Sequence, residues 1–182
     1  MIRGLLPWLL GLAGTSIAHG ACTPGWLPTA RLEVNGPVLA SLSWDNDGPG
    51  PQRAVLVVAG VFTMAGGVEA HNIAVYDGQN WSPLGSGLTG PLRTSGVRAL
   101  AIFDDGTGPK LHAGGIFSES GPTPVNNIAR WDGKSWSPLQ SGITGSLSTS
   151  GVHSLAVFGN DPALYAGGSF HTAGGITARN IA

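Results

Sequence analysis

Apolar residues along this chain occur in short runs that are separated by turn-forming residues. The run Val97–Phe103 carries apolar side chains on both faces, which is typical of a strand buried between neighbouring sheets. Asp132-Gly133 lies further along, and an Asp-Gly pair indicates a hairpin because the turn needs a residue that tolerates positive φ. We predict four strands in this part of the chain: Val97–Phe103, Leu111–Phe117, Asn127–Trp131 and Ser135–Leu139.

This four-stranded pattern repeats with a period of about 55 residues. Asn72-Ile73-Ala74 recurs as Asn127-Ile128-Ala129 and as Asn180-Ile181-Ala182, at spacings of 55 and 53 residues. Further segments return at the same spacing: Asp77-Gly78 as Asp132-Gly133, Trp81–Leu84 as Trp136–Leu139, and Ser95–Val97 as Ser150–Val152. The hairpin geometry predicts that Tyr76 lies opposite Trp81 and Trp131 opposite Trp136. Four strands in about 50 residues, repeated, are typical of a β-propeller blade.

The repeats divide the chain into a lead-in at 21–37, blades at 38–96 and 97–151, and a partial blade at 152–182. Closed propellers have about 4–8 blades, so the simplest interpretation is the N-terminal part of a longer propeller. An open solenoid-like stack and a self-assembled ring are the alternatives. An incomplete third blade leaves Leu164–Phe170 as a sheet edge with unpaired backbone groups, and we expect chains to associate through it.

The residues of the repeat resemble a known family. The glycine doublets Gly114-Gly115 and Gly167-Gly168 end the second strand of their units, and each full unit then has two aromatic residues near its hairpin. This pattern resembles the kelch repeat and the propeller of the galactose oxidase central domain. It is most similar to Gly-rich exported bacterial repeats that read roughly ALAVFDDGTGPALYAGGxF…NIARWDGxxWxxLGxG. The resemblance covers about 24–182 and implies an all-β fold of kelch-like blades, about two and a half in number, without implying an activity.

Residues 1–20 have the pattern of an export signal. Arg3 precedes the apolar stretch Gly4–Ala18, and Ala18 and Gly20 provide the small residues of a cleavage site before Ala21. The stretch is shorter than the roughly 20 apolar residues that a membrane-spanning helix needs. We therefore expect no membrane span and a secreted or cell-surface protein.

Cys22, the only cysteine, leaves a lipid anchor as an alternative. The segment His19–Cys22 resembles a bacterial lipoprotein box, although His19 stands where that box has an aliphatic residue.

Composition narrows the classes of function. Gly contributes 30 residues and Pro 13, which is incompatible with a protein of long helices. Lys and Arg number 9 against 10 Asp and Glu, so the basic excess of a nucleic-acid-binding protein is missing. The expected partner is therefore a protein or a glycan.

No catalytic constellation emerges from the motifs. Gly133-Lys134-Ser135 matches only the tail of a phosphate loop, and the motifs of serine hydrolases and zinc proteases are missing. The likeness to galactose oxidase implies a copper site with tyrosine and histidine ligands, yet Tyr76 and Tyr165 occupy positions where other repeats carry packing residues. The histidines that follow the signal are spread over different repeat positions; they are His71, His112, His153 and His171. We expect no catalytic residue, no cofactor and no metal.

The remaining polar motifs favour structural roles. Asp45–Gly48 and Asp104–Gly106 lack the ligand spacing of a calcium loop and are interpreted as turns. Asn72, Asn127 and Asn180 recur once per unit, which predicts that each side chain hydrogen-bonds the backbone of its turn. Asn80-Trp81-Ser82 is a formal glycosylation sequon, relevant only in a host that glycosylates.

The sequence thus favours an exported, non-enzymatic binding or scaffold module that displays variable loops on a rigid array of blades. The alternative is a fragment of a propeller enzyme, galactose-oxidase-like or glycan-processing, whose catalytic residues would lie in further blades.

Overall fold

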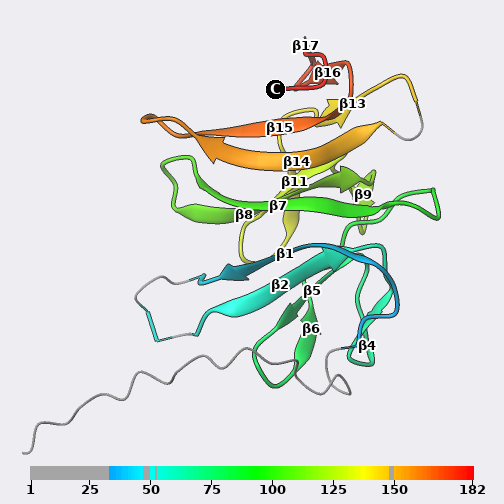
Figure 1. Ribbon diagram of the computed structural model, residues 1–182, viewed down its shortest axis with the longest axis vertical. Coiled ribbons are helices and arrows are strands. Elements are labelled where there is room, and N and C mark those ends of the chain that lie inside the picture. Colours follow the sequence, from blue (N-terminus) through cyan, green and yellow to red (C-terminus); the bar gives the residue numbers. More distant parts are fainter. Residues whose placement is uncertain (1–32, 47–49, 52, 148–149) are drawn as a thin grey trace, which may run out of the picture.

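The computed structural model describes residues 33–46, 50–51, 53–147 and 150–182 (Figure 1). All regular secondary structure in these ranges is β-strand, and the strands pair antiparallel, which confirms the predicted all-β class. The predicted export signal, Cys22, and Asp47 and Gly48 of the Asp45–Gly48 segment lie outside the described residues. Within the described ranges, no helix is long and apolar enough to cross a membrane.

Each of the first two repeats forms a four-stranded meander. The first sheet consists of β1 (Val38–Trp44), β2 (Val55–Gly60), β5 (Ile73–Tyr76) and β6 (Trp81–Pro83), in that order. The second sheet consists of β7 (Gly96–Asp104), β8 (Pro109–Ile116), β11 (Ile128–Trp131) and β12 (Trp136–Pro138). The four strands predicted for the second repeat are confirmed, with ends that differ by at most two residues.

The hairpin that closes each of these sheets has the predicted geometry. Tyr76 pairs with Trp81 and Trp131 with Trp136 across the strands, with ring centroids 5.2 and 5.4 Å apart. In the second of these turns Gly133 has a φ of 97°, and Oδ1 of Asp132 accepts the main-chain N–H groups of Lys134 and Ser135 at 2.8 and 2.7 Å. These hydrogen bonds lower the pKa of the Asp132 carboxyl below its ordinary value. The same N–H groups would be needed in a phosphate loop, and here the aspartate occupies them.

The third repeat contributes β14 (Gly151–Phe158) and β15 (Ala163–Ser169). Residues 180–182 run along β15: the N–H groups of Ala166 and Gly168 donate to the carbonyls of Ala182 and Asn180 at 2.8 and 3.0 Å. The expectation that Leu164–Phe170 forms a bare sheet edge is therefore corrected, because the beginning of the repeat's third strand covers part of it.

Every repeat also contains a short hairpin that the sequence pattern did not predict. These hairpins are β3 (Met64–Ala65) with β4 (Val68–Glu69), β9 (Glu119–Ser120) with β10 (Thr123–Pro124), and β16 (Thr172–Ala173) with β17 (Ile176–Thr177). The chain that enters each repeat pairs with that repeat's hairpin, through Val34, through Thr89 and through β13 (Ile143–Thr144). Strands of two residues are too short to show an alternation of apolar and polar positions, so they give no periodic signal in the sequence.

The sheets of successive repeats stack face to face in chain order (Figure 1). On one side of the second sheet, Leu100 and Ile102 pack in one cluster with Trp44 of the first sheet. On the other side, a Cβ on Gly114 would lie 2.5 Å from Val152 of the third repeat. The prediction that the first strand of a repeat is buried between neighbouring sheets is thus confirmed for β7.

All sheets are stacked in the same sense. We call the side of each sheet that points toward the next repeat its leading face, and the opposite side its trailing face. Matching positions form the leading faces: Ala40, Leu42, Val57 and Ala59 in the first sheet, Ala99, Ala101, His112 and Gly114 in the second, and Ser154, Ala156, Tyr165 and Gly167 in the third. A register shift also occurs at the same place in each first strand, at Val38/Ala40, Val97/Ala99 and Val152/Ser154. The repeats are therefore equivalent in three dimensions as well as in sequence.

Candidate functional site

The recurrent asparagines connect each repeat to the next. Oδ1 of Asn72 accepts the N–H of Phe62 at 3.0 Å, and its Nδ2 donates to the carbonyl of Leu88 at 2.7 Å. Leu88 belongs to the segment that leaves the first sheet for the second repeat. The side chain therefore bonds the backbone of its own repeat and that of the connection, which confirms the predicted structural role.

Asn127 and Asn180 occupy the equivalent positions. Asn127 bonds the N–H of Phe117 and the carbonyl of Ile143 at 3.1 and 2.8 Å, and Asn180 accepts the N–H of Phe170 at 3.4 Å. The φ angles of Asn72, Asn127 and Asn180 are 65°, 68° and 66°. This left-handed conformation favours asparagine among the non-glycine residues, which explains the recurrence.

A cleft of about 490 Å³ opens between the second and third repeats. Phe103, His112 and Arg130 of the second sheet line one wall, and Leu164 and Ala166 of the third repeat line the other. The size lies within the range of about 300–1,000 Å³ that small-molecule sites usually have. The cleft combines apolar walls with a few polar side chains, which is the usual composition of a binding site.

The polar side chains of this cleft interrupt the repeat pattern. His112 and Arg130 stand where the first repeat has Val57 and Val75, and Val57 is fully buried against the second sheet. The sequence reasoning placed His112 on a core strand but did not single out Arg130. An alignment of the repeats that asked where a charged residue replaces an aliphatic one would have found Arg130.

His112 is held neutral in this wall. Its side chain is buried, with 3% of its surface exposed, and burial lowers the pKa of its imidazole. Nδ1 lies 3.0 Å from the carbonyl oxygen of Lys110. Because a carbonyl oxygen only accepts hydrogen bonds, Nδ1 carries the proton and Nε2 is the acceptor nitrogen. The ring stands edge-on to Phe103, with centroids 5.8 Å apart.

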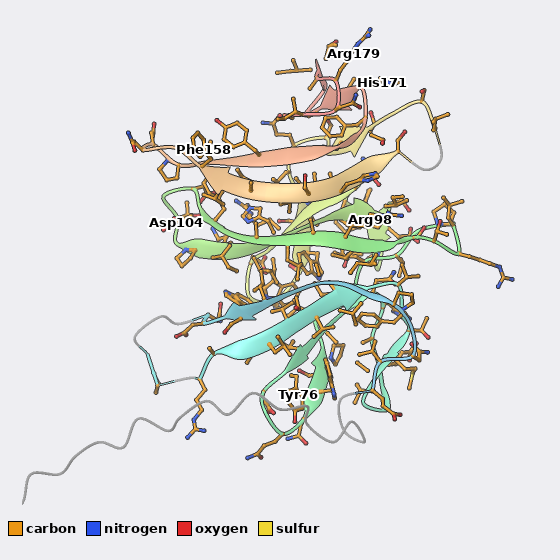
Figure 2. The ribbon with its side chains drawn as sticks, viewed as in Figure 1. Tyr76, Arg98, Asp104, Phe158, His171 and Arg179 are labelled. Carbon is orange, nitrogen blue, oxygen red and sulfur yellow. The ribbon has the colours of Figure 1, made fainter. Side chains whose placement is uncertain are left out.

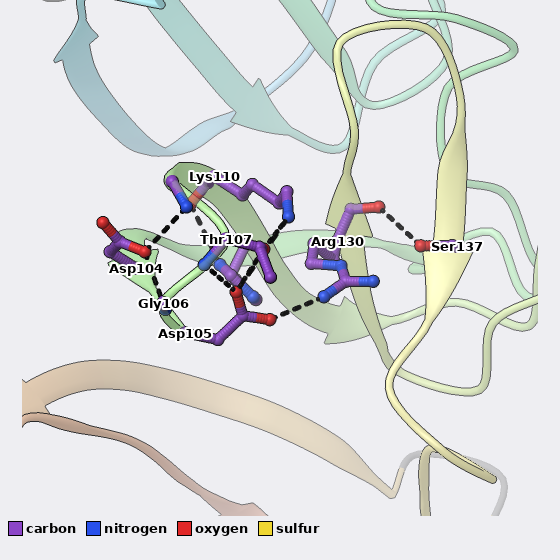
Figure 3. A network of polar contacts seen from close by, with 9 residues as sticks. Asp104, Asp105, Gly106, Thr107, Lys110, Arg130 and Ser137 are labelled. Atoms are coloured by element: carbon purple, nitrogen blue, oxygen red, sulfur yellow. Dashed lines mark hydrogen bonds and ion pairs between the residues drawn. The ribbon is translucent and has the colours of Figure 1, made fainter.

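Asp105 joins the residues beside the cleft into one network (Figure 3). Its Oδ2 accepts a hydrogen bond of 2.8 Å from Nη1 of Arg130, and its Oδ1 lies 4.0 Å from Nζ of Lys110. The hydroxyl of Thr107 also donates to Asp105, and this bond is the main cause that lowers the pKa of the Asp105 carboxyl. Two cations, Lys110 and Arg130, therefore share the Asp105 carboxylate.

The neighbouring Asp104 stabilises the turn between β7 and β8. Its Oδ1 accepts the N–H groups of Gly106 and Gly108 at 2.8 and 2.9 Å, which closes the turn between β7 and β8. The interpretation of Asp104–Gly106 as turn residues is confirmed. The turn also places Asp105 where Arg130 can reach it (Figure 3).

The structure does not bring the other candidate residues together. His71 lies 3.2 Å from Glu69, beside the hairpin of the first repeat, whereas His153 and His171 are exposed in the third repeat. Tyr76 belongs to the first sheet and donates to the carbonyl of Gly78 at 2.9 Å, while Tyr165 lies on β15 of the third repeat. In the part of the chain that the structure describes, no three or more His, Cys, Asp or Glu side chains form a group that could hold a metal ion.

The lining of the cleft suits binding better than acid–base catalysis. Asp105 is its one carboxylate, and hydrogen bonds and two cations hold that carboxylate in the ionised form. The neutral His112 and the guanidinium of Arg130 provide an acceptor and donors at fixed positions. Comparison with known proteins returns no family model, no curated protein and no solved structure that matches this chain.

Proposed function

We propose that this chain is an exported, non-enzymatic β-propeller repeat protein that acts as a binding module, with the cleft between the second and third repeats as its ligand site. The kelch-like repeat and the uniform stacking of its sheets support a rigid scaffold of propeller blades. The observation that carries the binding role is the replacement of Val57 and Val75 by His112 and Arg130 at equivalent positions. Both side chains line the cleft, where a ligand can contact them.

The chemistry of the cleft favours a glycan over a protein as ligand. A sugar ring offers C–H groups on its faces and hydroxyl groups at its rim, which match apolar walls with a few oriented polar groups. Phe103, Leu164 and Ala166 provide the apolar contact, and Arg130 and His112 provide a donor and an acceptor. Arg130 is the cation that lines the cleft, and a guanidinium forms charge-assisted hydrogen bonds with a carboxylate, so we expect an acidic sugar to bind better than a neutral one.

The test compares an acidic and a neutral oligosaccharide by isothermal titration calorimetry. Trigalacturonate should bind the wild-type chain more tightly than maltotriose. The double variant His112→Val/Arg130→Val restores the residues of the first repeat, so its fold should persist. Loss of a hydrogen bond to a charged group costs about 1.5–3 kcal/mol, so the affinity should fall about tenfold or more.

A control variant distinguishes the loss of the cleft residues from the loss of a positive charge elsewhere on the protein. Arg93 is an exposed arginine in the loop that precedes β7, and it does not line the cleft. Arg93→Gln should leave trigalacturonate binding unchanged. Equal binding by the wild type and the double variant would contradict the proposed site. Release of shorter sugars during the titration would instead favour the enzyme alternative.

Export is part of the proposal and depends on residues 1–20, which lie outside the described residues. A secreted or cell-surface location follows from the order of charge, apolar stretch and cleavage site. N-terminal sequencing of exported material should find Ala21 first. A lipid-modified Cys22 at the N-terminus would place the protein on a membrane anchor instead.

A further inference from the structure

Gln140 lines the cleft and has an unusual backbone conformation. Its φ is 52°, in the left-handed region that residues with a Cβ rarely adopt. Of the five described non-glycine residues with a positive φ, four are asparagines, whose short side chains can bond the local backbone. Gln140 is the fifth, and glutamine has no such preference. Residues held in strained conformations gather at functional sites, so this position calls for an explanation.

The first repeat shows what the turn around Gln140 requires. Gly85 is the equivalent residue, and its φ is 63°. The same hydrogen bond closes the turn in both repeats, from the N–H of Gly87 to the carbonyl of Leu84 at 3.3 Å and from the N–H of Gly142 to that of Leu139 at 2.9 Å. Glycine takes a positive φ without strain, whereas glutamine does not. The second repeat therefore carries the less favourable residue for this turn.

The side chain of Gln140 does not serve the fold through hydrogen bonds. It is exposed, and among the described residues its amide has no hydrogen-bond partner. It extends toward the hairpin of β16 and β17, where a Cβ on Gly174 would lie 2.2 Å from its Oε1. His171, which Figure 2 labels, immediately precedes this hairpin. The amide thus stands at the border of the cleft, between the second and the third repeat, where a ligand can reach it.

Gln140 shares this cleft with two other departures from the repeat pattern. His112 and Arg130 replace valines of the first repeat, and Gln140 replaces Gly85. In each case the second repeat has a polar side chain where the first has an aliphatic one or none. Three polar replacements that converge on one cleft favour a common ligand that contacts all three.

We propose that Gln140 determines the specificity of the cleft, and that its amide binds two neighbouring hydroxyl groups of an acidic sugar. This inference rests on the proposed function. A primary amide accepts a hydrogen bond at its oxygen and donates from its nitrogen, so it can bond two adjacent hydroxyls at once. Arg130 provides the charge-assisted contact with the sugar's carboxylate. The ligand class is therefore a uronic acid whose adjacent ring hydroxyls are unmodified.

The test uses two variants of Gln140 in the full chain. Gln140→Leu keeps a side chain of similar size at the same φ but removes the amide, and Gln140→Gly restores the residue of the first repeat. Both should bind trigalacturonate about five- to tenfold more weakly than the wild type in isothermal titration calorimetry, as the loss of two neutral hydrogen bonds predicts. Acetylation of the ring hydroxyls of trigalacturonate should weaken binding to the wild type and leave binding to Gln140→Leu nearly unchanged.

Stability without ligand gives a second readout that a structural role would not produce. Gln140→Gly relieves the strain of the positive φ, so its melting temperature should rise by about 2–4 °C in circular dichroism. Gln140→Leu keeps the strain and should melt close to the wild type. Gln140→Gly is thus expected to be more stable and to bind less well. A fall in its melting temperature would show that Gln140 serves the fold and would overturn the proposal.

A control variant and two binding outcomes complete the test. Gln79→Leu removes an exposed glutamine from the turn of the first sheet, outside the cleft, and should leave the affinity unchanged. Wild-type affinity in Gln140→Leu, together with lost binding in His112→Val/Arg130→Val, would overturn the role of Gln140 and leave the proposed cleft intact. A wild-type chain that does not bind trigalacturonate would overturn the proposed ligand class and this inference with it.

Discussion

The indole Nε1 of Trp136 donates a hydrogen bond of 2.9 Å to the main-chain carbonyl of Leu84, although 52 residues separate them. Trp136 lies on the last strand of the second sheet, and Leu84 follows the last strand of the first. Both are buried, with exposed fractions of 3% and 6%. One side chain therefore connects successive repeats by a hydrogen bond and by packing, and it does so at a position that recurs in the sequence as Trp81.

Replacement of Trp136 by phenylalanine tests this connection. The variant keeps an aromatic ring but leaves the carbonyl of Leu84 buried without its donor, which costs about 1–3 kcal/mol. Trp136→Ala should cost more, about 3–5 kcal/mol, because it also leaves a cavity. Urea denaturation followed by circular dichroism measures both. Tyr76→Phe, which removes only a hydrogen bond in an exposed turn, is the control and should change stability by less than about 1 kcal/mol. A Trp136→Phe chain as stable as the Tyr76→Phe chain would contradict this role.

Replacing the recurrent asparagines should lower the free energy of unfolding by different amounts at equivalent positions. Asn72→Gly keeps the positive φ but removes two side-chain hydrogen bonds, one of them to the Leu88 carbonyl, so the free energy of unfolding should fall by about 2 kcal/mol. Asn72→Ala should cost about 1 kcal/mol more, because alanine is strained at a φ of 65°. Asn180→Gly should cost little, since Asn180 is exposed and its bond to Phe170 is 3.4 Å long. Equal losses of stability at Asn72 and Asn180, measured by thermal and urea denaturation, would argue against a role of the Asn72 side chain in connecting the repeats.

Gly114 lies where the second sheet packs closely against the third repeat. A Cβ there would lie 2.5 Å from Cγ1 of Val152, a fully buried residue that cannot move aside. Gly114→Ala should therefore destabilise the chain by about 1–3 kcal/mol through overpacking. At the equivalent Gly167 a Cβ would meet only the hydroxyl of Ser154 at short range, which can rotate away. Gly167→Ala, measured by the same urea denaturation, should be clearly milder.

Stability should depend on pH through His112. Burial lowers the pKa of His112 in the folded chain below the unfolded value of about 6.5. The unfolded state therefore binds this proton more readily, so the stabilisation is complete above the unfolded pKa and is lost as the pH falls through the folded pKa. His112→Val should flatten the fall in urea midpoint between pH 7.5 and pH 5. His153→Gln removes an exposed histidine on β14 and should leave the slope as in the wild type. An unchanged slope in His112→Val would show that other groups control it.

Much of the architecture could be predicted from local pattern. The strands around Val97 and Leu111 have apolar residues on both faces, and such runs, bounded by turn residues, form strands wherever the chain places them. The Asp132-Gly133 turn determines its own register, because the aspartate caps the loop and glycine takes the positive φ. The repeat of Asn72 at Asn127 indicated a structural role before any contact was known.

Other features depended on contacts between repeats. The hairpin of β9 and β10 forms because Thr89, about 30 residues earlier, pairs with Glu119, and two-residue strands carry no periodic signal of their own. Arg130 looked like an ordinary variation of the repeat until the turn at Asp105 placed a carboxylate 2.8 Å from its guanidinium.

Sequence alone determined that this is a repeating all-β chain whose turns, strands and asparagines serve the fold, because these features depend on neighbours along the chain. Only the tertiary structure decided that the sheets stack in one sense, that His112 and Arg130 border a cleft, and that residues 180–182 cover part of β15. The physical reason is that burial and electrostatic pairing depend on which distant surfaces meet. Val38 and Val97 occupy equivalent positions, yet one is 48% exposed and the other fully buried, because among the described residues only Val97 has a neighbouring sheet packed against it.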